Sequence, residues 1–182
     1  MRSSMLRKPL ALFAIALLPL TGCSTAPPSG IDPVRGFQLE RYQGRWYEIA
    51  RLDHRFERGL QAVSADYSRN ADGSIRVVNR GYDAAAASWR QAVGKAWFNG
   101  PADVASLKVS FFGPFYGGYH VAALDPGYRW AVVVGPDKDY LWLLSRDKQP
   151  APAAKPALLA VTARLGVPAD KLIWVRQDRG DN

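Results

Sequence analysis

The sequence predicts an all-β domain: an eight-stranded antiparallel up-and-down barrel, or calyx, with one C-terminal α-helix packed outside and a short final strand. Eight short segments that alternate apolar and polar residues follow one another, and turns rich in glycine and proline separate them. The segments do not alternate with helical patterns, which argues against a parallel sheet. One helical pattern with a single apolar face covers residues 155–165, and a last strand-like segment covers residues 171–175.

The eight predicted strands share the period of two that places one face of a strand on the core. They cover residues 46–52, 63–67, 75–82, 89–98, 106–112, 119–124, 128–134 and 140–146. The Asp72-Gly73 pair between the second and third strands is a strong hairpin signal. Eight antiparallel strands joined by short turns can close without an exposed edge, and a barrel of this size can hold one small ligand. The pattern therefore favours a barrel over a sandwich.

The first 22 residues have the layout of a secretory signal peptide. Basic residues at positions 2, 7 and 8 precede an apolar run over residues 10–20, and the string Leu20-Thr21-Gly22-Cys23 ends the segment. The apolar run is too short for a transmembrane helix, which needs roughly 20 residues. The segment resembles a bacterial lipoprotein signal, in which the cysteine thiol receives a diacylglycerol and becomes the new N-terminus.

This resemblance implies three parts of the chain. Residues 1–22 are a signal peptide that is removed, and residues 23–35 are a lipidated N-terminus with Cys23 as the lipidation site. Serine, proline and glycine are frequent in residues 24–34, which predicts a flexible tether. Residues 36–178 form the barrel with its helix. Ser24 stands after the cysteine instead of an aspartate, so by resemblance to the bacterial sorting rule the protein goes to the outer membrane.

Composition excludes several classes of protein. The formal net charge of +8 falls to +5 when residues 1–22 are removed, because that segment has three basic and no acidic residues. The remaining basic residues are scattered, which is not typical of a nucleic-acid-binding surface. Cys23 is the only cysteine, so no disulfide framework or zinc–thiolate site is expected. No catalytic motif surrounds His54 or His120, and we expect no catalytic residue, no metal and no cofactor.

Several further motifs and segments resemble one family. Gly44-Arg45-Trp46 resembles the G-x-W motif that opens the first strand of lipocalins, and Arg146 matches the lone arginine that ends their last barrel strand. Residues 107–115 and 135–146 resemble the bacterial lipocalin branch, whose members are outer-membrane lipoproteins. Asp125 is the one good match to the family's T-D-Y motif. The resemblance runs from about Gly36 to Val175. It implies a calyx that binds and carries a small lipophilic molecule. It also implies that the domain faces the periplasm of a Gram-negative bacterium.

Trp46 and Arg146 are predicted to meet at the base of the barrel. They lie on the first and last strands, which become neighbours when the barrel closes. An arginine over an indole face is worth about 0.5–2 kcal/mol. We interpret this pair as structural, because it would plug the narrow end of the barrel.

The ligand cavity is predicted from the residues that share the inward face of each strand. If Trp46 and Arg146 point inward, alternation carries the same direction along their strands. The predicted cavity residues are Glu48, Ala65, Tyr67, Val77, Asn79, Phe98, Val109, Phe111, Tyr119, Val121, Val133, Tyr140, Trp142 and Leu144. This lining is mostly apolar with a few polar points, which suits a fatty acid or a lysophospholipid.

Alternation alone leaves other interpretations open. The same side chains could fill a closed barrel with no cavity. The protein could store or transport its ligand, it could be an enzyme that acts on a bound lipid or isoprenoid, or it could be a purely structural envelope lipoprotein. A homodimer also stays open, while no nucleic-acid partner is expected.

Overall fold

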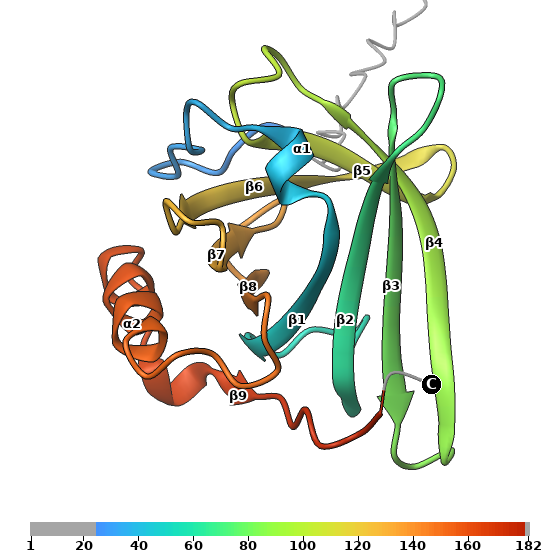
Figure 1. The fold of residues 1–182 in the computed structure, drawn as a ribbon, viewed down its shortest axis with the longest axis vertical. Coiled ribbons are helices and arrows are strands. Elements are labelled where there is room, and N and C mark those ends of the chain that lie inside the picture. The colour runs from blue at the N-terminus through green and yellow to red at the C-terminus, as the bar shows by residue number, and fades with distance from the viewer. Residues whose placement is uncertain (1–24, 181–182) are drawn as a thin grey trace, which may run out of the picture.

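Eight antiparallel strands close into a barrel in the computed structural model, which describes residues 25–180 (Figure 1). The barrel strands are β1 (Gly44–Arg51), β2 (Leu60–Arg69), β3 (Ile75–Asp83), β4 (Ser88–Phe98), β5 (Ser106–Phe112), β6 (Phe115–Leu124), β7 (Trp130–Val134) and β8 (Leu141–Ser145). Neighbours in sequence pair with one another, and β1 closes the ring by pairing with both β2 and β8. A ninth strand, β9 (Ile173–Trp174), pairs with β1 outside the ring. The predicted fold class is confirmed.

Most strands differ from their predicted bounds by one or two residues at one or both ends, and two strands begin three or more residues early. β2 begins at Leu60, three residues before the predicted start, and β6 begins at Phe115 instead of residue 119. Tyr116, Gly117 and Gly118 therefore lie inside β6, although the predicted strand begins after them. The pairing is irregular in this region, because the register between β5 and β6 shifts between Val109 and Phe112. The hydrogen bonds between strands continue through residues that do not alternate between apolar and polar side chains. A prediction from alternation therefore underestimates the length of these strands.

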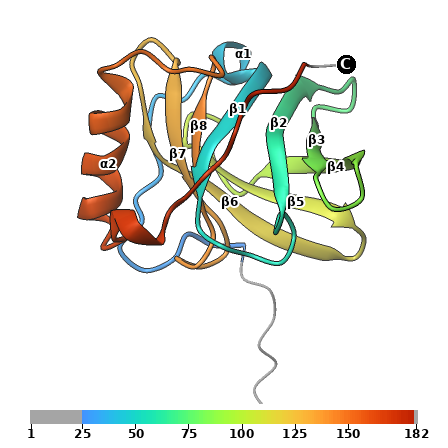
Figure 2. The same cartoon turned by 90° about the horizontal axis from the view of Figure 1, so that it is seen from below.

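The helices lie at the base and on the side of the barrel. The predicted C-terminal helix is α2 (Ala154–Arg164), which packs against the outer face of β7 (Figures 1 and 2). The single-turn helix α1 (Leu39–Tyr42) was not predicted, since one turn shows no periodicity. A 3-10 helix over Ala169–Lys171 connects α2 to β9.

The barrel wall separates two apolar cores. On β7, Ala131 and Val133 belong to the core inside the barrel, whereas Val132 and Val134 belong to the core beneath α2. This split follows from the period of two along a strand. Both cores draw their buried members from residues between Ile31 and Leu172. A domain that begins at Thr25 therefore contains every buried residue of these two cores.

The segment before the barrel is packed in place over its described part. Ile31 is buried, and the backbone of Val34 accepts from Ala105 N and donates to Val121 O, both at 2.9 Å. The Thr25 carbonyl accepts a hydrogen bond from Asn99 Nδ2 at 2.6 Å. These hydrogen bonds and the burial of Ile31 hold residues of the predicted tether to the barrel. The predicted lipidation site, Cys23, lies outside the described residues.

No helix within residues 25–180 has the length and apolar character needed to cross a membrane.

Candidate ligand-binding cavity

The base of the barrel is built around Trp46, which is fully buried on β1. Its indole Nε1 donates to the Tyr42 carbonyl at 2.8 Å, and the Tyr42 ring lies 4.7 Å from it between centroids. The guanidinium of Arg146 covers the indole, with Cζ 4.0 Å from the ring centroid. The structure thus places the two predicted base residues in direct contact.

Arg146 also ties three backbone segments together at the base. Its Nη1 donates to the Arg45 carbonyl at 2.8 Å, its Nη2 to the Arg41 carbonyl at 2.7 Å, and its Nε to the Tyr128 carbonyl at 3.3 Å. Gly44 lies beside it with a φ of +88°, a conformation that side chains disfavour. The G-x-W motif therefore supplies both the turn and the indole on which the arginine rests.

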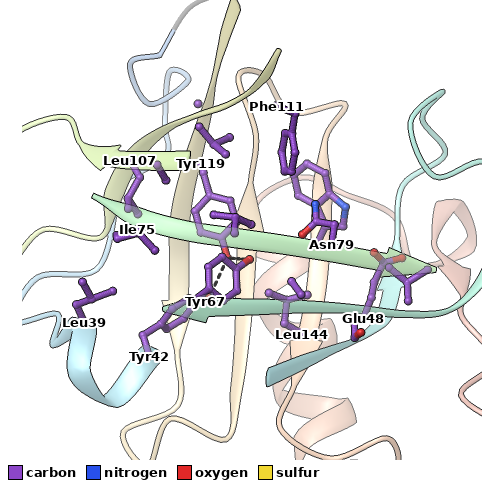
Figure 3. A pocket seen from close by; sticks show the side chains of 18 of the residues that line it. Leu39, Tyr42, Glu48, Tyr67, Ile75, Asn79, Leu107, Phe111, Tyr119 and Leu144 are labelled. Carbon is purple, nitrogen blue, oxygen red and sulfur yellow. Dashed lines mark hydrogen bonds between the residues drawn. The ribbon is translucent and has the colours of Figure 1, made fainter. Parts of the chain in front are cut away.

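Above this base the barrel holds a cavity of about 110 Å³ (Figure 3). Most of the residues predicted from alternation lie on its wall. They are Glu48, Ala65, Tyr67, Val77, Asn79, Val109, Phe111, Tyr119, Trp142 and Leu144. Valine, leucine and phenylalanine side chains make up much of the wall, so the cavity is largely apolar.

Four predicted residues do not line this cavity. Val121 and Val133 are fully buried in the core inside the barrel, where they fill space that a ligand would need. Phe98 lies at the end of β4, and its ring packs edge-on against Phe37 at 6.2 Å. Tyr140 precedes β8 and stacks on His54 at 5.5 Å, in the loops outside the wall. Alternation gives the face of a residue but not its depth along the barrel axis.

Three tyrosine hydroxyls meet inside the cavity, between Leu39 on one side and Glu48 on the other (Figure 3). The Tyr119 hydroxyl bonds the hydroxyls of Tyr42 at 2.7 Å and Tyr67 at 2.9 Å (Figure 3). Burial raises the pKa of all three phenols above the ordinary value of 10.0. The three groups therefore stay neutral at physiological pH and can both donate and accept hydrogen bonds.

A second polar cluster is formed by Glu48, Glu57 and Trp142, which also face the cavity. Arg51 is buried and joins them: its Nη1 donates to Glu48 Oε1 at 2.6 Å and its Nη2 to the Glu57 carbonyl at 2.7 Å. Trp142 Nε1 donates to Glu57 Oε2 at 2.8 Å, and His54 Nε2 lies 3.1 Å from the same oxygen. The cluster fastens the loop between β1 and β2 to the cavity wall.

The two carboxyl groups of this cluster have opposite pKa shifts. Burial, reinforced by the nearby Glu57, raises the pKa of Glu48. Burial also acts to raise the pKa of Glu57, but hydrogen bonds from His54 and Trp142 outweigh it, and the net pKa shift is downward. A proton therefore binds to Glu48 more readily than to Glu57.

Two important wall residues were missed by the sequence analysis. Glu57 lies in the loop before β2 and Tyr42 lies on α1, so neither belongs to an alternating strand. The signal for Tyr42 was its place four residues before Trp46, which brings its carbonyl to the indole. No comparable signal marks Glu57. Among residues 25–180 no cluster of His, Cys, Asp or Glu is arranged to hold a metal ion.

Comparison with known proteins gives relatives over most of the chain. The outer membrane lipoprotein Blc of Escherichia coli (strain K12) is 52% identical over 170 residues, which cover 93% of this chain and 96% of that protein. The protein of the same name from Vibrio cholerae is 48% identical over 160 residues, which cover 87% of this chain and 92% of that protein. These relatives support an outer-membrane lipoprotein of a Gram-negative bacterium.

The fold and the sequence lead to the same family. Insecticyanin from the tobacco hornworm Manduca sexta superimposes with a TM-score of 0.67 over 85% of this chain and 87% of that one, and its 21% identity makes this a likeness of fold. The lipocalin-like domain family matches residues 37–177. Because this match spans most of the chain and the relatives cover nearly all of it, the chain belongs to the lipocalin-like family.

Proposed function

We propose that the protein carries one single-chain amphiphile, a fatty acid or a lysophospholipid, in the barrel cavity. The observation that supports this most is the combination of chemistry on the cavity wall. Apolar side chains that include Val77 and Val109 line the cavity together with the tyrosine hydroxyls and the polar cluster at Glu48, Glu57 and Trp142. Such a wall suits a molecule with a long tail and a polar end.

The energetics of an acyl chain fit this interior. Each methylene that leaves water contributes about 0.8 kcal/mol, so a long chain can offset the cost of association and reach micromolar affinity. The cavity of about 110 Å³ is smaller than the roughly 300–1,000 Å³ of typical ligand pockets. A ligand must therefore displace wall side chains such as Phe111 and Trp142, or leave part of its length outside the barrel.

A binding experiment with the domain that begins at Thr25 tests the proposal. We expect fatty acids and lysophospholipids to bind with one ligand per barrel in native mass spectrometry, and to change the tryptophan fluorescence because Trp142 lines the cavity. Glycerol 3-phosphate, which has no acyl chain, is the control ligand and should not bind. Binding of the control without binding of the lipids would contradict the proposal. Recovery of the lipid in chemically altered form would favour the enzyme alternative instead of a carrier.

We propose in addition that Cys23 carries the lipid anchor. Replacing it in the full chain, Cys23→Ser, should leave an unprocessed protein or a soluble periplasmic one, because the thiol is the only acceptor in the signal. Cell fractionation and the intact mass of the protein measure the result, with Ser29→Ala as the control substitution in the same segment. A Cys23→Ser protein that is still lipid-modified in the outer membrane would show that the anchor lies elsewhere.

A further inference from the structure

The turn between β5 and β6 exposes an unusual amount of aromatic surface. Phe112 and Phe115 face each other across the turn and are 77% and 69% exposed. Tyr116 follows at 37% exposed, and its ring meets Trp97 of β4 edge-on at 6.0 Å. The exposed Val93 of β4 lies beside them on a shallow surface hollow. We call these five residues the hairpin patch; contiguous apolar surface of this kind marks an interaction site.

Basic residues border the hairpin patch. Arg76 of β3 and Lys95 of β4 line the same shallow hollow as Trp97 and Tyr116. Lys108 of β5 lies with its Nζ 5.6 Å from the centre of the Tyr116 ring. Asp72 pairs with Lys95 at 3.0 Å, so the border keeps a positive balance of charge. Aromatic side chains inside a basic border match the interface of an anionic lipid bilayer.

The position of the N-terminus places this surface near the membrane. The Thr25 carbonyl accepts a hydrogen bond from Asn99, the residue directly after β4. Cys23 lies two residues before Thr25, and two residues of extended chain span at most roughly 7 Å. From there β5 leads to the hairpin patch over roughly 17 Å. Figure 1 shows β5 and β6 crossing the upper part of the molecule, with their turn projecting past β4. One bilayer surface can therefore meet both the start of the described chain and the hairpin patch.

We propose that the hairpin patch docks the domain on an anionic phospholipid bilayer. The phenyl rings of Phe112 and Phe115 enter the headgroup region, and Arg76, Lys95 and Lys108 contact lipid phosphates. A single lipid anchor combined with a basic surface is a common pair of membrane-binding signals. Docking fixes the side of the barrel that faces the membrane. It brings the bilayer beside Phe111, the residue before Phe112, whose ring lines the cavity.

The proposal goes beyond the carrier function and is tested without any cavity ligand. The domain that begins at Thr25 is mixed with vesicles of phosphatidylglycerol and phosphatidylcholine, or of phosphatidylcholine alone, and the bound fraction is measured by sedimentation. We expect binding to the anionic vesicles that weakens with added salt. The affinity of the double variant Phe112→Ser/Phe115→Ser for anionic vesicles should fall by a factor of roughly ten or more, because the substitutions remove two rings from the interface. The variant Arg76→Gln/Lys108→Gln should lose the preference for anionic vesicles.

The matched control is Ile173→Ser, which removes an apolar side chain that is 39% exposed on β9. It should bind vesicles as the unmodified domain does, and thermal melts should show all variants folded. Equal binding by the phenylalanine double variant, or an equal loss in the control, would overturn the proposal. Concentration-dependent dimers that disappear in the phenylalanine double variant, without vesicle binding by the unmodified domain, would assign the patch to a second copy of the chain instead.

Discussion

Replacing Trp46 by alanine should lower the free energy of unfolding by about 3–5 kcal/mol, the largest effect expected of a single substitution in this barrel. The indole is fully buried, stacks between Tyr42 and Arg146, and donates its one hydrogen bond to a backbone carbonyl. Its removal leaves a cavity at the closed end and an acceptor without a partner. Urea or guanidinium melts of the domain that begins at Thr25 measure the loss.

Arg146→Ala should cost about 2–3 kcal/mol, because three carbonyls lose a charged donor. The double variant with Trp46→Ala should lose less than the sum, by about 0.5–2 kcal/mol, since each single change already removes the stacking contact. Arg129→Ala is the control: this arginine is exposed and pairs with Asp125, so its loss should cost at most about 1 kcal/mol. Strictly additive losses at Trp46 and Arg146 would show that the stacking contributes no coupling energy.

Alternation predicted the architecture because the barrel wall separates two apolar environments. β7 shows this directly, since Ala131 and Val133 face the inside while Val132 and Val134 face α2. The strands beneath α2 are therefore nearly continuous apolar sequence, whereas the other strands alternate more clearly. Glycine or proline marks most of the turns, although the β3–β4 turn consists of alanines. The approach of Trp46 to Arg146 followed from ring closure alone, because the first and last strands of a barrel must pair.

The parts that could not be predicted depend on position along the barrel axis or on contacts far apart in sequence. Val121 and Tyr119 share one face of β6, yet the first fills the core and the second lines the cavity. Glu57 reaches the cavity only because Arg51, His54 and Trp142 hold its loop against the wall. The packing of residues 25–35 depends on acceptors and donors in β6 and the loop before β5, which composition does not reveal.

Filling the cavity should abolish most of the proposed ligand binding while the barrel stays folded. Ala65 lies on β2 between Trp46 and Asn79 in the ladder and lines the cavity. The ring added by Ala65→Phe takes up much of a cavity of about 110 Å³. Excluding about four methylenes of an acyl chain costs about 3 kcal/mol, which is roughly a 100-fold loss of affinity. Overpacking should lower the free energy of unfolding by only about 1–3 kcal/mol.

Fluorescence titration with a fatty acid and a lysophospholipid measures this loss, and a denaturant melt checks the fold. The control is Ala86→Phe, which adds the same ring at an exposed position of the β3–β4 turn and should leave affinity unchanged. Unchanged affinity in Ala65→Phe would mean that the lipid binds outside the barrel. The hairpin patch around Phe112 would then be the first surface to test, and Phe112→Ser/Phe115→Ser should remove the binding that Ala65→Phe leaves. A loss confined to Ala65→Phe places the acyl chain inside the barrel beside Ala65, in the cavity whose wall also includes Val109 and Leu144.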